Sequence, residues 1–593
     1  MIKDPSQDIA INYPVELSLF VTAPPGYGKT YVMIKRVEYL ISRECITPPR
    51  KLLALTFSNA AADEMKKRLI KNIPYVEKYV DVMTFHTFAY KLLRCYGNNI
   101  GISRFFTILD ESKKKEYKYT YYRTHFKECS SKWKREDDFV SEYNNWYTKK
   151  FLQSKSYIDI DNETIFENLR NLMNEDLINK ENLDFDHLLF KAIDLLQQNE
   201  YVKSLFFDKY PILLADEFQD TNYIQYKLFR EIGIDSKGTK KIVYVMGDKK
   251  QAIMRFQGAN PDNIAFLIQD FNCKIHELKK NHRTDSEYIL HITKKLRDPS
   301  LFVLEAKHEM YIHSTVEQEM KRLIELILRL LQNGANPHNI CILFPQKRTS
   351  NCIKKVFEEN SIEYIDISDF KIDSITEEYS VLIQGIRKQI EEKCTKKSVK
   401  RIIDELIDEN YSSESKNTIQ LTTIRKFSSS FDRGHFSSIE VWKRLQEFYN
   451  CIQMEIDWVQ LVKSNVRNKV YLSTIHGSKG LEFDYIFMIG MVNFKMPHST
   501  SCFPCSNYQN PQQVDISESK DLFYVGVSRA IKEIIFFYSR QDEQNLATKS
   551  RKISCVFKDI VECLQFIDTE NKVYDYRDLR INSLLCQSNF DSI

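Results

Sequence analysis

The sequence has no uninterrupted apolar run of about 18 residues, so we do not expect a membrane-spanning helix. Its first residues do not resemble a cleavable secretory signal, and its 13 cysteines are scattered along the chain. Both features indicate an intracellular, cytoplasmic protein with reduced thiols. The net charge of only +4 excludes a polycationic surface, so any nucleic-acid site has to be a local basic groove.

A cysteine cluster with the spacing of a zinc site is also missing. Cys502 and Cys505 have the spacing of half such a site, but no second pair and no histidine pair lies nearby at zinc-site spacing. We therefore interpret these two cysteines as an unligated pair in a loop.

What the sequence does have is length and a regular alternation of strands and helices. With 593 residues, 43% of them hydrophobic, the chain is expected to form three or four domains. Short apolar strands alternate with helical segments, which predicts parallel sheets covered by helices on both faces. Residues 91–183 and 370–468 are helical, polar stretches that look like insertions into this pattern.

A glycine-punctuated loop joins the first predicted strand to the first long helix. Residues 23–30 read APPGYGKT, with Ala23 where the general pattern has glycine. Backbone N–H groups of such a loop, and of the helix that follows, bind phosphates. Lys29 is expected to reach the β- and γ-phosphates, and the Thr30 hydroxyl to bind Mg²⁺. The alternative, a chance glycine-rich turn, is disfavoured by the acidic strand end further along the chain.

That strand end lies at residues 212–222, which read ILLADEFQDTN. A strand of this kind carries acidic side chains to the carboxyl edge of a parallel sheet, where α/β folds bind ligands. Asp216 can then hold Mg²⁺, and Glu217 can orient or deprotonate a water molecule. The polar residues that follow exceed what hydrolysis needs, which indicates that the site also communicates with a second ligand.

Three more side chains suit a transferring phosphoryl group. Gln251 follows a strand that ends in Gly247-Asp248, and its amide can touch the γ-phosphate while its neighbours touch a polymer. Arg283 and Arg529 can stabilise charge on the transferring group. An isolated arginine is usually a solvated surface residue, so this prediction depends on the whole set.

Aromatic and small polar residues follow other predicted strands. Phe57 and His86 stand at two such ends, where aromatic faces can stack on bases at roughly 1–3 kcal/mol each, although core packing is the commoner role. The turn at 473–483, STIHGSKGLEF, presents His476 and Lys479 to a phosphodiester backbone, and Glu482 to a ribose hydroxyl. An ordinary polar turn is the alternative there.

Taken in order, these segments resemble the UvrD/Rep family of superfamily 1 helicases. The matching segments are AxxGxGKT, LTFxNAAxxEM, TFHTF, DFDHLL, DEFQDTN, GDxxQAI, NxRT, TxHGSKGLEF and YVGVSRA. The resemblance implies an α/β fold with two RecA-like parallel-sheet motor domains, each with a mainly helical inserted subdomain. It also implies ATP and Mg²⁺ as cofactors and 3′ to 5′ movement on single-stranded DNA with duplex unwinding.

The resemblance further implies the domain boundaries. The first motor domain (1A) takes residues 1–90 and 184–285, its insertion (1B) 91–183, the second motor domain (2A) 286–369 and 469–545, its reduced insertion (2B) 370–468, and a C-terminal tail 546–593. Ile567-Asp568 and residues 574–577 faintly echo a nuclease site found in some relatives, but we prefer a structural tail.

The family's site residues carry over to matching positions of this sequence. The implied nucleotide-site residues are Gln7 for adenine, Ala23, Pro24, Pro25, Gly26, Tyr27, Gly28, Lys29, Thr30 and Tyr31 at the phosphate loop, Gln251, Arg283 and Arg529 as γ-phosphate sensors, and Glu482 at the ribose. Asp216 and Thr30 are the implied Mg²⁺ ligands, and Glu217 the general base. The implied DNA-facing residues are Phe57, Asn59, His86, Met254, Phe256 and His476.

Several positions depart from the family pattern. His282 stands where the family usually has an aromatic residue that stacks on adenine, and Tyr31 replaces a common arginine, so base selectivity is in question. Met254 replaces a common base-stacking tyrosine, and Gln257 a common arginine. The second insertion is also much shorter than in housekeeping members, which implies a reduced regulatory domain.

Two functions follow from this sequence. The first is an ATP-dependent helicase that acts on single-stranded DNA and on single-strand/duplex junctions. The second is a DNA-stimulated ATPase subunit that senses DNA ends and regulates a partner, such as a nuclease in a DNA repair or antiviral defence complex. A binding scaffold with a dead ATPase is disfavoured, because every expected catalytic residue is present.

Overall fold

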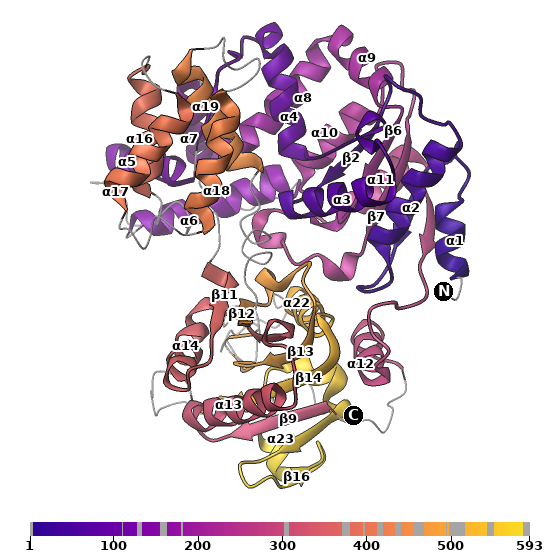
Figure 1. Ribbon diagram of the computed structural model, residues 1–593, viewed down its shortest axis with the longest axis vertical. Coiled ribbons are helices and arrows are strands. Elements are labelled where there is room, and N and C mark those ends of the chain that lie inside the picture. Colours follow the sequence, from indigo (N-terminus) through magenta and orange to yellow (C-terminus); the bar gives the residue numbers. More distant parts are fainter. Residues whose placement is uncertain are drawn as a thin grey trace.

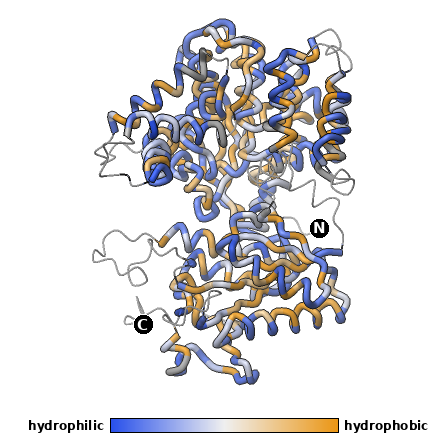
Figure 2. The backbone as a smooth tube through the Cα atoms, turned by 90° about the vertical axis from the view of Figure 1, so that its left-hand side faces the viewer, coloured by the Kyte–Doolittle hydropathy of each residue, from blue (hydrophilic) through white to orange (hydrophobic). Residues whose placement is uncertain are grey.

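Two lobes, each built on one mainly parallel sheet, make up the computed structural model (Figure 1). The structure describes residues 4–109, 111–126, 133, 135–154, 163–179, 182–301, 308–369, 380–394, 398–411, 419–432, 440–455, 468–493, 495–496, 516–541 and 551–584. The strand-rich centre of each lobe is mainly hydrophobic (Figure 2), as expected for sheets that are covered on both faces.

The first sheet has six strands, all parallel, in the order β3-β2-β6-β7-β1-β8. The strands are β1 (Leu19–Thr22), β2 (Leu52–Thr56), β3 (Val80–Thr84), β6 (Ile212–Ala215), β7 (Ile242–Gly247) and β8 (Lys274–Glu277). Neighbouring residues of one strand, such as Leu53 and Ala54, belong to cores on opposite faces. This two-sided burial explains the continuous apolar runs in the sequence.

Helices cover both faces of the first sheet. One face carries α1 (Pro5–Ile11), α2 (Lys29–Ser42) and α3 (Asn59–Asn72), and the other α4 (Phe85–Tyr96), α8 (Phe185–Gln198), α9 (Glu200–Lys209), α10 (Tyr223–Gly233) and α11 (Asn263–Phe271). Short turns in the connections are η1 (Val76–Lys78), η2 (Gly97–Ile100), η4 (Phe218–Asp220), η5 (Lys249–Gln251) and η6 (Arg255–Gln257). Arg36 of α2 donates to the carbonyl groups of Ile11 and Tyr13, which anchors the segment that follows α1.

The second sheet has the order β11-β12-β10-β13-β14-β9-β15-β16, and all its strands are parallel except β16. Its strands are β9 (His308–His313), β10 (Ile340–Phe344), β11 (Tyr364–Asp366), β12 (Val470–Thr474), β13 (Phe483–Met488), β14 (Ala530–Ser539), β15 (Leu564–Ile567) and β16 (Val573–Tyr574). One face packs against α12 (Glu287–Arg297) and α22 (Ser517–Val527), and the other against α13 (Val316–Gln332) and α14 (Ser350–Glu359). Connecting turns are η7 (Pro337–Asn339), η8 (Lys347–Thr349), η9 (Ile367–Asp369) and η13 (His476–Ser478).

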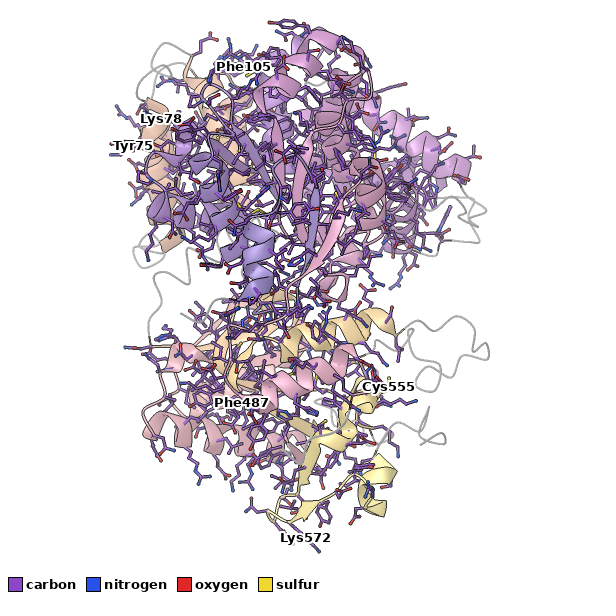
Figure 3. The ribbon with its side chains drawn as sticks, turned by 90° about the vertical axis from the view of Figure 1, so that its right-hand side faces the viewer. Tyr75, Lys78, Phe105, Phe487, Cys555 and Lys572 are labelled. Atoms are coloured by element: carbon purple, nitrogen blue, oxygen red, sulfur yellow. The ribbon has the colours of Figure 1, made fainter. Side chains whose placement is uncertain are left out.

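Residues 551–584, which we expected to lie in a C-terminal tail, extend the second sheet instead. They form η15 (Cys555–Cys563), β15, β16 and α23 (Leu579–Leu584), and β15 pairs with β9. Leu564 and Phe566 are buried in the core of the second lobe, which is why this segment packs there. Cys555 and Lys572 accordingly lie in the same lobe as Phe487 of β13 (Figure 3).

The first insertion is helical, as predicted, and has an aromatic core of its own. It contains α5 (Glu111–Phe126), α6 (Glu136–Tyr147), the π-helical turn η3 (Thr148–Leu152) and α7 (Glu163–Asn179). Trp146, Phe139 and Phe166 pack together at its centre. At its base, the short strands β4 (Thr107–Ile108) and β5 (Asn182–Leu183) pair with each other.

The second insertion is helical too, but it lies against the first lobe. Its elements are α16 (Ser380–Glu391), α17 (Val399–Asn410), α18 (Ile419–Ser428), η11 (Ser429–Asp432) and α19 (Val441–Glu455). Figure 1 shows these orange helices beside the purple helices of the first insertion. In α19, Asn450 donates to Phe106 O and accepts from Ile108 N, both at 3.1 Å. Glu447 accepts a hydrogen bond from Tyr90 of α4.

In the part of the chain that the structure describes, no helix is both long and apolar enough to cross a membrane. The same residues contain no group of three or more His, Cys, Asp or Glu side chains placed to hold a metal ion. Cys502 and Cys505 lie outside the described residues.

Candidate functional site

The loop 23–28 leads from the carboxyl end of β1 directly into α2, whose first residue is Lys29. Gly26 and Gly28 both have a φ of 84°, in the left-handed region that favours glycine. A Cβ at Gly28 would lie 2.4 Å from Gln7 Nε2, and a Cβ at Gly26 would lie 2.7 Å from Arg283 Cβ. No described side chain caps α2, so its first N–H groups can bind an anion.

Lys29 lies buried beside this loop. Its Nζ atom has no hydrogen-bond acceptor among the described residues, and Glu217 Oε1 lies 3.5 Å away. A buried ammonium group without an acceptor is unfavourable, and a phosphate oxygen would satisfy it. This orphaned donor fits a nucleotide phosphate.

Two carboxylates stand at the carboxyl end of β6. Burial and the adjacent charge of Glu217 raise the pKa of Asp216 above its ordinary value. Burial also opposes ionisation of Glu217, but the Lys29 and Lys479 ammonium groups lower its pKa, so it stays a carboxylate. An ionised Glu217 can accept a proton, and the oxygens of Asp216 and Thr30 are the donor type that Mg²⁺ prefers.

Glu217 and Gln251 are joined through two other side chains. Gln219 Nε2 donates to Glu217, and Gln219 Oε1 accepts from the Asp248 N–H at 2.9 Å. Asp248 Oδ2 in turn accepts from Gln251 Nε2 at 2.8 Å, and Gln251 Nε2 also lies 3.4 Å from Ala23 O in the phosphate loop. The predicted sensor Gln251 therefore lies beside the loop, and Gln219 and Asp248 are supporting residues that the sequence did not reveal.

The two predicted arginines lie at the boundary between the lobes. Arg283 follows β8 of the first sheet and lies against Gly26 of the phosphate loop, whereas Arg529 lies directly before β14 of the second sheet. Arg283 forms an ion pair with Glu482 at 2.7 Å and donates to Ser528 O at 2.8 Å. Arg529 is 3% exposed and donates to Val525 O, Leu481 O and Ser528 Oγ. Burial first, and then repulsion by Arg283, lower the pKa of Arg529 to about 9.

A small pocket lies between the phosphate loop and Arg283. Its lining includes Pro24, Tyr27, Arg283, Arg297 and Tyr524. The structure thus brings the predicted phosphate loop and one of the two predicted arginines to one pocket between the lobes. Arg297 also lines this pocket, although no pattern in the sequence singles it out.

Two of the residues expected near adenine, Gln7 and His282, lie against the same loop. Gln7 is buried and donates to Tyr27 O at 3.0 Å, whereas Tyr31 is 45% exposed. The His282 backbone N–H donates to Gly26 O, and its Nε2 donates to Asp4 Oδ2 at 2.9 Å. Asp4 was not expected at this site.

The six residues expected to face DNA are spread over several strand ends. Phe57 follows β2, Asn59 begins α3, and Met254 is half-buried after β7. His86, at the start of α4, packs edge to face on Phe185 with ring centroids 5.4 Å apart. Burial lowers the pKa of His86, so it is neutral rather than a cation for phosphates.

Phe256 and His476 are the two of these residues that meet. Their rings lie edge to face with centroids 5.1 Å apart, and Phe256 is 56% exposed. They come from different lobes, so this aromatic surface spans both. Exposed rings of this kind can stack on nucleobases.

We expect Lys479 to face solvent from the polar turn at 473–483, but the structure places it between the lobes. Its Nζ pairs with Asp220 at 2.5 Å and donates to Gln251 O at 2.9 Å. Burial raises the pKa of Asp220 to about 6 in spite of this lysine. The partners are distant in sequence, so no local pattern could reveal that Lys479 ties the two lobes together.

Comparisons with known proteins agree with this geometry. The family model for the UvrD/REP helicase N-terminal domain matches residues 3–272, and that for the UvrD-like helicase C-terminal domain matches residues 369–541. The chain is similar to the ATP-dependent DNA helicase Rep of Buchnera aphidicola (26% identity over 87% of this chain and 92% of the relative) and of Escherichia coli (24%, 91% and 91%). It is also similar to the ATP-dependent DNA helicase PcrA of Staphylococcus aureus (23%, 87% and 80%). These names favour the first of the two predicted functions.

Proposed function

The chain belongs to the UvrD/REP helicase family, and we propose that it is an ATP-dependent helicase that moves 3′ to 5′ on single-stranded DNA and opens duplexes at single-strand junctions. The observation that carries this proposal is the orphaned ammonium group of Lys29. It lies 3.5 Å from Glu217, while Arg283 of the same lobe reaches across to Ser528 O and Arg529 belongs to the opposite lobe. A nucleotide phosphate at Lys29 would contact groups from both lobes.

Each of these residues has a distinct part in hydrolysis. Lys29 and the free N–H groups of α2 bind the β- and γ-phosphates, and Glu217 takes a proton from the attacking water. Arg283 and Arg529 stabilise the charge that develops on the transferring group. When bound by Asp216 and Thr30, Mg²⁺ would neutralise phosphate charge.

Hydrolysis is coupled to movement, because the nucleotide would lie in the cleft that separates the two lobes. A nucleotide phosphate held by Lys29 and Arg283 of the first lobe and by Arg529 of the second draws the lobes together, and loss of the phosphate releases them. The contact between Phe256 and His476 spans the lobes, so each cycle shifts these rings relative to each other. Stacked bases would be passed along by this motion.

Strand displacement on 3′-tailed and 5′-tailed duplexes, measured beside phosphate release, tests the proposal. We expect ATP-dependent displacement from the 3′ tail, and loss of both activities in Lys29→Ala. Lys35→Ala is the matched control, because Lys35 lies on the same helix and pairs with Glu38 on its exposed face. DNA-stimulated hydrolysis without displacement by the wild type would favour the DNA-sensing subunit instead, and retained turnover in Lys29→Ala would refute the nucleotide site.

A further inference from the structure

An ion pair at the end of α12 joins the two lobes beside the nucleotide cleft. Arg297, the last residue of α12, donates from Nη1 to Asp248 Oδ2 at 2.6 Å. Helix α12 packs against α22 and β14 of the second lobe, whereas Asp248 follows β7 of the first. The Asp248 side chain is only 2% exposed, so Arg297 compensates a buried charge from across the cleft.

The same oxygen of Asp248 also holds Gln251. Gln251 Nε2 donates to Asp248 Oδ2 at 2.8 Å, while Asp248 Oδ1 accepts from Lys250 N at 3.2 Å. The Asp248 N–H is fixed in turn by Gln219 Oε1. The first lobe thus sets the backbone of this turn, and Arg297 is the contribution of the second lobe to the carboxylate that orients Gln251.

Arg297 is itself held by the helix that leads to Arg529. Its Nη1 atom donates to the Tyr524 hydroxyl at 3.2 Å, and its guanidinium carbon lies 5.5 Å from the centroid of the Tyr524 ring. Burial alone would lower the pKa of Arg297, but Tyr524 and Asp248 together hold it above its ordinary value. The guanidinium group of Arg297 therefore stays charged at neutral pH.

We propose that Arg297 is a positioning residue for hydrolysis, which fixes Asp248 and thereby aligns Gln251 with the phosphate loop when the two lobes are closed. This inference rests on the proposed function, because it takes Gln251 to contact the γ-phosphate. A bond of 2.6 Å does not survive separation of the lobes by a few ångströms. Opening of the cleft therefore releases the sensor, and γ-phosphate sensing depends on closure.

A second ion pair across the lobes provides a matched control. Arg255 of the first lobe pairs with Asp521 of α22 at 3.2 Å. It links the lobes, but in the part of the chain that the structure describes it forms no hydrogen bond or ion pair with Asp248 or Gln251. If Arg297 acted only by holding the lobes together, removal of either arginine would have the same effect.

The test compares Arg297→Met, Arg297→Lys and Arg255→Met by DNA-stimulated ATPase on the full chain. We expect Arg297→Met to lower kcat roughly ten- to hundredfold, the range for a misplaced reacting group, with the KM for ATP within about threefold. Arg297→Lys, which keeps the charge but not the fork geometry, should restore part of the loss. Arg255→Met should change kcat by less than about threefold.

Coupling to Asp248 distinguishes a positioning role from a general structural one. If Arg297 acts through Asp248, then adding Arg297→Met to Asp248→Asn lowers kcat no further. This double variant has no buried unpaired carboxylate. It can therefore replace Arg297→Met in the test if a thermal melt shows that Arg297→Met alone does not fold.

Each outcome decides the question. A wild-type protein without DNA-stimulated hydrolysis overturns the proposed function and this inference together. With an active wild type, an unchanged kcat in Arg297→Met, equal losses in Arg255→Met, or a further loss in the double variant each overturns the inference alone.

Discussion

The ring of Phe256 meets the ring of His476 edge to face, with centroids 5.1 Å apart. Phe256 belongs to η6, which follows β7 of the first sheet, and His476 begins η13, which follows β12 of the second. Because each ring is fixed to a different lobe, any change in the distance between the lobes must part or slide them. The nucleotide cleft and this aromatic surface are therefore mechanically linked.

Replacement of Phe256 by alanine is expected to weaken binding of single-stranded DNA about tenfold. The ring is 56% exposed, and a stacked base contributes roughly 1–3 kcal/mol. Hydrolysis without DNA should stay close to wild type, because the ring of Phe256 packs on His476 rather than on the phosphate loop. Fluorescence anisotropy with a labelled oligonucleotide measures the affinity. Tyr201→Ala, which removes a ring that is 74% exposed on α9, should leave it unchanged.

Substitution of Glu217 by glutamine should preserve nucleotide binding and reduce kcat roughly a hundredfold or more, which is the usual contribution of a general base. Glutamine keeps the size of the side chain and can still accept from Gln219, but it cannot take a proton. Binding of a fluorescent ATP analogue and single-turnover phosphate release separate the two effects. Glu231→Gln, the same exchange in an ion pair with Lys203 outside the cleft, is the control, and wild-type turnover in Glu217→Gln would refute the base assignment.

The parts of this molecule that the sequence predicts are those encoded by contiguous segments. A strand followed by a glycine loop and a helix brings Lys29 to the sheet edge whatever surrounds it, and the same holds for Asp216 and Glu217 after β6. Parallel strands all deliver their following residues to one edge. Local pattern and sheet topology therefore suffice to place these groups.

Contacts between distant segments were not predictable, because no local pattern encodes them. Lys479 pairs with Asp220, and Arg297 with Asp248, through single polar contacts that leave no periodicity in the sequence. The second insertion is held against the first lobe by side chains of α19 such as Asn450, which bonds to backbone groups of Phe106 and Ile108 at β4. Likewise, β15 joins the second sheet by pairing with a strand about 250 residues earlier in the chain.

Exchange of Asp4 for asparagine is expected to raise the KM for ATP about three- to tenfold with kcat within about twofold. Burial opposes ionisation of Asp4, yet hydrogen bonds from Ser6 and His282 hold its pKa below the ordinary value. Its carboxylate thus fixes the imidazole of His282, which stands where the family usually has an adenine-stacking ring. Loss of a charged partner for one hydrogen bond corresponds to about 1 kcal/mol, or about fivefold.

Asparagine caps helices as well as aspartate does, so α1 and Gln7 should keep their places. Steady-state ATPase at saturating DNA gives both constants. In a His282→Ala background the same exchange should have no further effect. An additional rise in KM there would show that Asp4 acts by another route.

The stability of the second lobe should fall as pH decreases from about 6.5 to about 4, because two buried histidines of β9 resist protonation. Burial lowers the pKa of His308 and of His313 to about 4, and Arg322 adds to the effect at His313. In the unfolded chain a histidine has a pKa near 6.5, so between these values the unfolded state binds a proton that the folded state does not. The free energy of unfolding is therefore highest, as far as these two histidines determine it, above about pH 6.5. It falls below that pH by about 1.4 kcal/mol per pH unit for each histidine.

His313→Phe removes one of these two groups and should halve the part of the pH dependence that they cause. His313 is 3% exposed and lies parallel to Phe537 with centroids 6.2 Å apart, so phenylalanine keeps the stacking. Melting temperatures recorded between pH 5 and pH 8 measure how steeply the stability of the variant and of the wild type depends on pH. Carboxyl groups whose pKa is raised, such as Asp220, act in both proteins and cancel in the difference. His125→Phe, at an exposed position of α5, should leave the pH dependence of the melting temperature unchanged. Equal pH dependence for His313→Phe and wild type would show that folding does not lower the pKa of His313.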